Sequence, residues 1–327
     1  MSIPPLELCR TILPLARRAR RAHLAGLYLS RLRLLPAGFL RRRRDAAIAE
    51  LLRNGERLPP IPLEPSGSEL EVHTMLHVRD LSYALWSLYS FLHHSGLRCA
   101  VVVHADGPWT DRESENLTRA FPGITLLSRT TRDAQIAQVL ARYPACLAYR
   151  ALGVFGPKLF DPYFFRTRPH VILVDSDVLF FRPPTELLDR TRYRSAHLRY
   201  NVEAGTGYRT RPMLMERFPV TEPNLNAGLV AATPDESWLR RLEAVLPALQ
   251  EIAQADRLRP GEDQTALAVV ARDAGWAPLP SEYSSNPEQF RRARSSIVSM
   301  HFHSWAKDLF AMEGIPHFIQ AATAAVP

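Results

Sequence analysis

Segments typical of strands and of helices alternate along the chain from residue 72 onward. Strands are predicted at residues 72–78, 98–106, 124–128 and 171–175, and helices at 80–94, at 111–121 and within 133–165. This alternation favours an α/β fold with a mostly parallel sheet and helices on both of its faces. In such sheets ligands bind beyond the carboxyl ends of the strands. A functional site is therefore expected at that edge.

The stretch HVILVDSDVLFF, residues 170–181, carries two aspartates, Asp175 and Asp177, at the end of a strand predicted to be buried. Two carboxylates this close repel each other unless one is protonated or a cation lies between them, and burial makes unpaired carboxylates costly. Oxygen ligands suit Mg²⁺ or Mn²⁺, which are usually shared with phosphate oxygens of a substrate. The pair therefore predicts a metal site, with capping aspartates in a strand-end turn as the structural alternative.

Five segments of the chain stand in an order that a known family shares. They are FGPKLFDPYFF (155–165), LVDSDVLFF (173–181), NLNAGLVAAT (224–233), GEDQTAL (261–267) and VSMHFHSWAKDLF (298–310). Together they resemble the nucleotide-sugar glycosyltransferases with the GT-A fold, and most closely glycosyltransferase family 8 and its relatives. LVDSDVLFF is similar to the DxD motif of that family, and the last segment to its His-x-x-Gly-x-x-Lys pattern, with Ser304 where glycine is usual. The resemblance covers residues 70–310 and implies a GT-A fold with a Rossmann-like sheet.

The resemblance also implies a role for each matched residue. Asp175, Asp177 and His301 would hold Mn²⁺ or Mg²⁺; Lys307, Lys158, Asp175 and Gly228 would bind the donor; Asn226, Asp263 and Gln264 would lie at the sugar and its reacting carbon. His303 lies two residues beyond His301, so in a strand both imidazoles would point to the same side. Only the register of the family motif favours His301.

The activity that the resemblance implies is transfer of a sugar from a nucleoside-diphosphate sugar, with a UDP-sugar favoured, to a hydroxyl group. The acceptor would be a glycan, a lipid-linked molecule or a protein, and the anomeric configuration of the sugar would be retained. Metal and Lys307 would stabilise the same negative charge as it develops on the departing diphosphate. Acceptor choice is expected in loops such as residues 190–222.

Lysine is rare in this chain. Of 41 basic side chains only two are lysines, Lys158 and Lys307, and both fall inside matched segments. An ammonium is a compact point charge, whereas a guanidinium is a wide planar fork. Two lysines in so arginine-rich a chain therefore indicate positions that need the smaller group.

The first 68 residues are predicted to form a basic extension. Residues 1–70 carry 13 arginines against six acidic residues, whereas the remaining 257 carry 28 basic against 27 acidic residues. Leucines at helical spacing predict helices within residues 10–57, and the proline-rich residues 58–68 predict a linker, so a catalytic domain is expected at 69–327. The arginines favour contact with an anionic membrane surface through residues 10–57. A solvated helix packed on the catalytic domain explains the same pattern equally well.

Composition bears on the compartment. No run of 18 apolar residues predicts a transmembrane helix, and the first residues lack the charged and apolar regions of a signal peptide. Cys9, Cys99 and Cys146 have no pairing pattern, which fits a reducing compartment. A cytoplasmic location is therefore expected, either free or peripheral on the inner membrane face, and no motif for nucleic-acid binding is present.

Two alternatives belong to other classes of protein. A strand that ends in Asp-x-Asp also begins the haloacid-dehalogenase-like phosphatases, in which Asp175 would be the nucleophile. Here the motif follows about 100 residues of βα units, Leu179 stands where Thr or Val is expected, and no later Gly-Asp-x-x-x-Asp segment occurs. The second alternative is a non-catalytic protein whose arginines bind an anionic surface.

Overall fold

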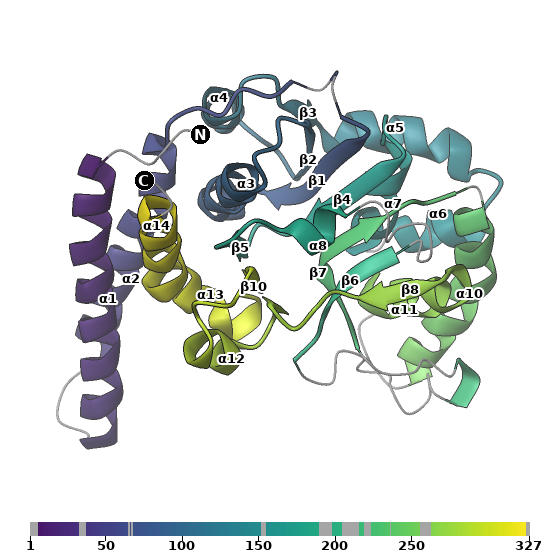
Figure 1. Ribbon diagram of the computed structural model, residues 1–327. Coiled ribbons are helices and arrows are strands. Elements are labelled where there is room, and N and C mark those ends of the chain that lie inside the picture. The colour runs from purple at the N-terminus through teal and green to yellow at the C-terminus, as the bar shows by residue number, and fades with distance from the viewer. Residues whose placement is uncertain are drawn as a thin grey trace.

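A mixed α/β architecture is built around one large sheet. The computed structural model describes residues 6–32, 37–64, 66, 68–151, 155–189, 198–204, 216–218, 224–235, 237–255 and 263–324 (Figure 1). The large sheet has seven strands in the order β3-β2-β1-β4-β7-β6-β8, and a small sheet beside it has the order β5-β10-β9. The small sheet begins where the chain leaves β4, which is where the sequence predicts a functional site.

The strands bear out the predicted α/β class. They are β1 (Leu70–His77), β2 (Ala100–Asp106), β3 (Thr125–Leu127), β4 (His170–Val174), β5 (Val178–Phe180), β6 (Leu198–Val202), β7 (Leu225–Ala232), β8 (Trp276–Pro278), β9 (Tyr283–Ser284) and β10 (Ser299–His301). Strands β3, β2, β1 and β4 are parallel, as predicted. Strand β7 runs antiparallel to both β4 and β6, so the sheet is mixed at this side. The amino end of β7 therefore meets the carboxyl end of β4.

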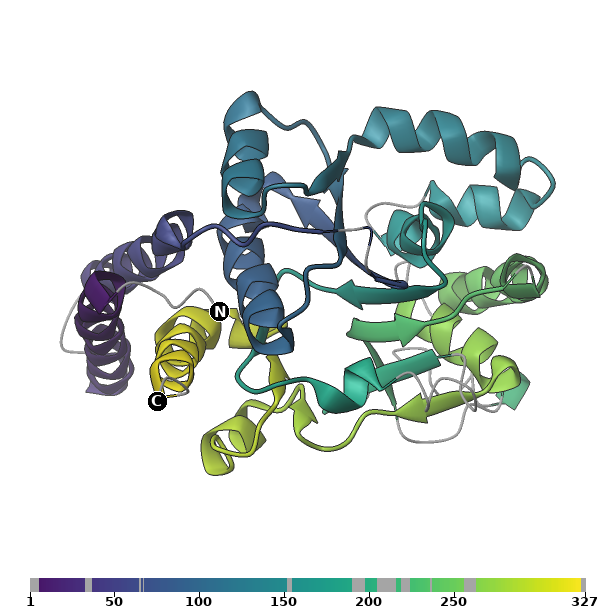
Figure 2. The same ribbon diagram turned by 45° about the horizontal axis from the view of Figure 1, so that its top comes forward.

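Helices cover both faces of the large sheet (Figure 2). The described helices that follow β1 include α3 (Leu81–Ser95), α4 (Asp111–Ala120), α5 (Arg129–Leu140), α6 (Pro144–Arg150), α7 (Phe155–Phe164), α8 (Thr185–Leu188), α10 (Ser237–Ala255), α11 (Asp263–Ala274), α12 (Pro287–Arg292), α13 (Lys307–Leu309), the π-helix η6 (Phe310–Gly314) and α14 (Ile315–Ala324). Helices α5, α6 and α7 replace the single helical region predicted within 133–165. Residues 141–143 separate the first two of them, and Pro144 is the first residue of α6.

Side chains of β4 point alternately to the two faces of the large sheet, and an apolar core lies on each face. Ile172 and Val174 point to the core that contains α3 and α14, whereas Val171 and Leu173 point to the core that contains α7, α10 and α11. Because successive side chains of a strand point to opposite faces, a strand covered on both faces is apolar throughout. This explains the continuous apolar run that precedes Asp175.

The extension forms a helical hairpin that packs beside α3 and α14 (Figure 1). It consists of α1 (Leu6–Leu32), α2 (Ala37–Arg53) and the 3₁₀-helix η1 (Asn54–Arg57), and its buried Ile12 and Leu51 belong to the same core as Phe318. The following segment is held by backbone hydrogen bonds, including one of 2.9 Å from Ile61 to Ala120. None of the described helices has both the length and the apolar character needed to cross a membrane. The division into residues 1–68 and 69–327 stays a prediction.

Candidate functional site

Asp175 and Asp177 lie where the chain passes from the large sheet to the small one. The backbone N–H of Asp175 donates to the carbonyl of Gly228 in β7 at 2.8 Å, and the carbonyl of Asp175 accepts from Ser87 Oγ in α3 at 3.0 Å. The carbonyl of Asp177 accepts from the backbone N–H of Phe302, just after β10, at 2.8 Å. The backbone of Asp175 is therefore fixed by β7 and α3, and that of Asp177 by the residue after β10. These contacts hold the two carboxylates close to each other.

His301, the last residue of β10, brings an imidazole to this pair. Its Nε2 atom lies 3.0 Å from Asp177 Oδ1 and 3.8 Å from Asp175 Oδ2, and one ligand atom from each of the three residues lies within 4.8 Å of the others. Neighbouring ligands of an octahedral ion with bonds of about 2.1 Å are about 3 Å apart. The spacing suits one shared divalent cation. His303 lies beyond β10 and instead contacts Glu203, with 3.2 Å from Nε2 to Oε1.

Asn226 fixes the tautomer of His301. The amide Nδ2 of Asn226 donates to Glu203 Oε2 at 2.6 Å, and its Oδ1 accepts the backbone N–H of Gly228 at 2.9 Å. Since Oδ1 is an acceptor, the Nδ1 atom of His301, 2.8 Å away, must carry the hydrogen. A neutral ring then presents the lone pair of Nε2 to Asp177. A carboxylate and a lone pair 3.0 Å apart require a proton or a metal ion between them.

Gly228 leaves the space that the imidazole of His301 occupies. A Cβ atom at this position would overlap the Cε1 and Nδ1 atoms of the ring. The sequence places this glycine beside the donor sugar, but in the structure the close approach is made by His301. Both residues come from matched segments, and the requirement for glycine at 228 follows from the position of the histidine.

The two lysines of the chain flank the carboxylates. Lys158 in α7 lies 2.8 Å from Asp175 Oδ2 and 3.5 Å from Asp263 Oδ2, while Lys307 lies 3.1 Å from Asp80 Oδ1 and 3.5 Å from Asp177 Oδ2. Burial alone would lower the pKa of Lys158, but the charges of Asp175 and Asp263 raise it. Both ammonium groups are therefore positive at neutral pH.

The carboxyl of Asp177 is strongly acidic. Burial would raise its pKa, but a proton on His301, which is the alternative to a metal ion between the two groups, and the charges of Lys307 and Lys158 outweigh burial and hold the pKa well below its usual range. Asp263 behaves in the opposite way. Its burial raises its pKa, in spite of Lys158. A charged carboxylate that remains available at any physiological pH is what a hard cation requires.

Comparison with known proteins was made at the level of sequence and of structure. No protein-family model and no curated protein matches the sequence. Similar solved structures include the apo bifunctional glycosyltransferase WbbM, with 15% identity, a TM-score of 0.54, and coverage of 80% of this chain and 53% of that one, so this chain spans about half of its length. The galactosyltransferase LgtC, in complex with donor and acceptor sugar analogs, has 13% identity, a TM-score of 0.53, and coverage of 79% and 96%. Mouse xyloside xylosyltransferase 1 has 12% identity, a TM-score of 0.50, and coverage of 75% and 98%.

This chain has the GT-A fold. The fold predicted from the DxD segment and its neighbours is thus confirmed. The phosphatase alternative, with Asp175 as nucleophile, finds no support in these comparisons, and neither does a non-catalytic surface-binding protein. At these identities the likeness concerns the fold alone.

Three further residues predicted from the GT-A resemblance lie beside the cluster. Asp263 begins α11 and is buried next to Lys158. Gln264 follows it, and its Oε1 accepts the backbone N–H of Ala227 at 3.2 Å. Asn226 supports His301, as described above. The structure therefore brings all the predicted site residues to the edge of the sheet around β4 and β7, although their roles toward a donor stay predictions.

A pocket of about 170 Å³ opens beside the cluster of this GT-A fold. It is lined by Met75, Leu76, His77, Arg79, Asp80, Asp106, Phe155, Lys158, Asp175, Ser176, Asp177 and Lys307. Most of the lining residues come from the carboxyl ends of β1, β2 and β4 and the segments that follow them, where parallel sheets place ligands, and the others come from α7 and α13. Phe155 is 49% exposed, unusually high for a large apolar side chain. An exposed ring at a pocket wall offers a planar surface for stacking.

Glu203 is the site residue that the sequence did not reveal. It follows β6, and its carboxylate contacts both Asn226 and His303. Burial would raise the pKa of Glu203, but the hydrogen bond and charge of His303 and the hydrogen bond from Asn226 lower it to about 2. The residues around Glu203 match no motif. Its distance along the chain from the Asn-Ala-Gly segment gives no indication that its carboxylate contacts Asn226.

Proposed function

We propose that this chain is a glycosyltransferase that moves a sugar from a nucleoside-diphosphate sugar to a hydroxyl acceptor. One observation carries the proposal: Asp175, Asp177 and His301 converge at the carboxyl edge of the sheet of a GT-A fold, beside a pocket walled by two lysines. The solved structure of LgtC, a galactosyltransferase of the same fold, contains donor and acceptor sugar analogs. This supports a donor and an acceptor as the two ligands of the present chain.

The cluster fits Mn²⁺ or Mg²⁺. It offers two carboxylates and one imidazole whose ligand atoms lie within 4.8 Å of one another, close enough to share one ion, and the open pocket leaves room for diphosphate oxygens. A divalent ion bound here would neutralise the diphosphate and stabilise it as a leaving group. Asp175, Asp177 and His301 are its proposed ligands, with Asn226 orienting the imidazole through Nδ1.

The two lysines have different proposed roles. Lys307 is partly exposed at the pocket wall, where its ammonium can reach the departing diphosphate and stabilise the charge that develops there. The Lys158 side chain is only 12% exposed and holds Asp175 and Asp263 in place. Asp263, Gln264 and Asn226 then lie on the side where the sugar would bind, with Asp263 able to accept a hydrogen bond from a sugar hydroxyl.

The proposed reaction retains the configuration of the sugar. The bond from the anomeric carbon to the diphosphate breaks, and the acceptor oxygen bonds to that carbon on the same face. The departing phosphate oxygen takes the acceptor proton. The family resemblance carries this step, and the nearness of Lys307 to Asp177 supports it by placing positive charge where the diphosphate would leave.

The pocket supports a nucleotide as the donor carrier. Phe155 offers a face for a base, and His77 and Asp80 offer polar groups for a nucleoside, with UDP favoured as the nucleotide. The acceptor would be a glycan, a lipid-linked molecule or a protein. The loop expected to choose it, residues 190–222, lies mostly outside the described residues.

We also propose that the extension contacts an anionic membrane surface from the cytoplasmic side. Helix α1 keeps its buried face against the body, while the side chains of Arg17, Arg18, Arg20 and Arg21 are exposed. Positively charged side chains near an anionic leaflet attract it at a range set by the salt concentration.

Thermal unfolding with Mn²⁺ and a panel of UDP-, GDP- and CMP-sugars tests the proposed function. At least one nucleotide sugar should raise the midpoint of unfolding in a metal-dependent way, and EDTA should remove the effect. Asp177→Asn should abolish the shift, whereas Glu115→Gln, which removes an exposed charge from α4, should leave it unchanged. A shift that survives in Asp177→Asn would contradict the metal assignment, and no shift with any nucleotide would contradict the function.

A further inference from the structure

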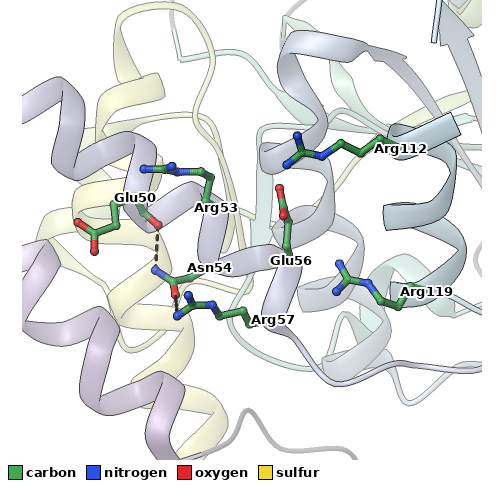
Figure 3. A pocket seen from close by; sticks show the side chains of 7 residues that line it. All are labelled: Glu50, Arg53, Asn54, Glu56, Arg57, Arg112 and Arg119. Carbon is green, nitrogen blue, oxygen red and sulfur yellow. Dashed lines mark hydrogen bonds between the residues drawn. The ribbon is translucent and has the colours of Figure 1, made fainter. Parts of the chain in front are cut away.

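A second, basic pocket lies at the seam between the extension and the catalytic body (Figure 3). It has a volume of about 500 Å³. It is lined by Glu50, Arg53, Asn54, Glu56, Arg57, Arg112 and Arg119. The first five residues come from the end of α2 and from η1, and the last two come from α4. None of them belongs to the metal cluster or to the pocket beside it.

Local structure explains why arginines from both sides line this seam. Arg112 and Arg119 are two helical turns apart and share one face of α4, whose Leu117 is buried in the core. Arg53 and Arg57 are four residues apart on the other side of the pocket.

The wall between these two arginines is tightly packed. Gly55 leaves no room for a Cβ atom, which would lie 3.0 Å from Trp86 Nε1, and that indole donates to the Leu52 carbonyl at 3.1 Å. The extension side of the pocket is therefore held rigidly on α3.

The four guanidinium groups carry charge that the described residues do not neutralise. No described carboxylate forms an ion pair with any of them; Arg53 donates to the Ala49 carbonyl at 3.3 Å, Arg57 to Asn54 Oδ1 at 3.4 Å and Arg119 to Asn116 Oδ1 at 3.1 Å. Each guanidinium has five N–H donors, so most of them stay open.

Two acidic residues also line this pocket, but only one aims its carboxylate into it. Figure 3 shows the carboxylate of Glu56 between the two sides, whereas that of Glu50 points away. The backbone carbonyl of Glu50 accepts from Asn54 Nδ2 at 2.8 Å. The pocket therefore carries a net positive charge.

We propose that this pocket binds a phosphate-bearing ligand, held between Arg53 and Arg57 of the extension and Arg112 and Arg119 of the body. The planar fork of arginine matches phosphate oxygens in pairs, and four guanidiniums that line one pocket favour a ligand with two or more negative charges. The ligand would offset the repulsion among the arginines and tie the extension to α4. Its phosphate belongs either to a soluble molecule or to a lipid headgroup, and the chemistry of recognition is the same for both.

Calorimetric titration of the full chain with inorganic pyrophosphate, in EDTA, tests this site. The exposed pair Arg112 and Arg119 is changed to glutamine, and Arg142→Gln with Arg240→Gln is the control because it removes two exposed arginines outside the pocket. Wild type and control should bind pyrophosphate alike, and the pocket variant should bind at least about tenfold more weakly, since charge-assisted hydrogen bonds are lost. No binding by wild type, or equal binding by both variants, would overturn the proposal.

Two further measurements separate this site from the candidate catalytic one and identify the source of the phosphate. Lys307→Met, which removes the ammonium proposed to contact a diphosphate at the candidate catalytic pocket, should bind pyrophosphate as wild type does; loss of binding there would mean that the titration reports that pocket, and would overturn the proposal. Sedimentation with phosphatidylglycerol vesicles, against phosphatidylcholine vesicles, completes the test. Vesicle binding that falls in the Arg112/Arg119 variant identifies a headgroup, and vesicle binding that stays unchanged while pyrophosphate binding falls identifies a soluble phosphate; both outcomes support the site.

Discussion

The Oδ1 atom of Asn226 lies 2.8 Å from the Nδ1 atom of His301, and this contact leaves Nε2 of the imidazole to face Asp177. Asn226 can act only as an acceptor there, because its Nδ2 is bound to Glu203 and its Oδ1 also receives the N–H of Gly228. Asn226, which is not itself a proposed metal ligand, thus sets the orientation and tautomer of His301, which is one. Most of the predictions below follow from this arrangement.

Asn226→Ala should weaken Mn²⁺ binding about tenfold or more, because loss of the partner that orients a histidine ligand typically costs that much affinity. Titration calorimetry with Mn²⁺ alone measures the effect without reference to activity. Asn286→Ala is the matched control, since Asn286 caps α12 with hydrogen bonds to Glu288 and Gln289. That change should cost about 1 kcal/mol of stability and leave Mn²⁺ affinity unaltered. Equal Mn²⁺ affinity in Asn226→Ala and wild type would refute the positioning role.

Gly228→Ala should displace the imidazole of His301, because the added methyl group would occupy the position of the ring. We expect a loss of about 1–3 kcal/mol in the free energy of unfolding, together with loss of Mn²⁺ binding. Gly96→Ala separates the two effects. Gly96 has a φ of 67° and open space around it, so its replacement should lower stability by about 1 kcal/mol without touching the metal cluster. Intact Mn²⁺ binding by Gly228→Ala would show that His301 is not a ligand.

The two lysines should respond differently to replacement by methionine. The Lys158 side chain is only 12% exposed and lies between Asp175 and Asp263, so Lys158→Met leaves two carboxylates without this partner and should cost about 3 kcal/mol in stability. The Lys307 side chain is 37% exposed, so Lys307→Met should cost less than about 1 kcal/mol but weaken binding of a nucleoside diphosphate. Chemical denaturation and nucleotide titration measure the two quantities. A larger loss of stability in Lys307→Met than in Lys158→Met would contradict the assigned roles.

The stability of the fold should fall in mild acid because of His94. Burial, with help from His93 and His317, lowers the pKa of His94 to about 3, and its buried Nε2 has no hydrogen-bond partner among the described residues. The unfolded chain binds this proton below about pH 6.5, whereas the folded ring binds it only near pH 3. The contribution of neutral His94 to the free energy of unfolding is therefore fully present above pH 6.5 and is lost progressively toward pH 3. At pH 5 the loss is about 1–2 kcal/mol.

His94→Leu removes this titration and should flatten the decline. Denaturant unfolding at pH 7.5 and pH 5 gives the difference for each protein. A wild-type chain and a His94→Leu variant with the same loss between these two pH values would exclude His94 as the cause.

The sequence indicated the parts of this molecule that local pattern controls. The strand that ends at Asp175 was predictable because a strand buried on both faces is apolar throughout, and the two aspartates after it stand out against that run. The grouping of His301 with Asp175 and Asp177 came from the order of matched segments. The antiparallel placement of β7 was not predicted, since local pattern does not specify which strands become neighbours.

The contacts that cross the fold could not be read from the sequence. Glu203 reaches Asn226 and His303 only because β6 lies beside β7, and the residues around it carry no motif. The packing of the extension was likewise open, because leucines at helical spacing predict an apolar face without saying what covers it. In the structure that face shares a core with α3 and α14.

The most direct test of the account is an anomalous difference map at the manganese edge, from a crystal of the chain grown with Mn²⁺ and UDP. The account predicts a peak within about 2–2.5 Å of Asp175, Asp177 and His301, with diphosphate oxygens completing its coordination. A map with bound UDP but no peak at these three side chains, or with the metal held elsewhere, would contradict it.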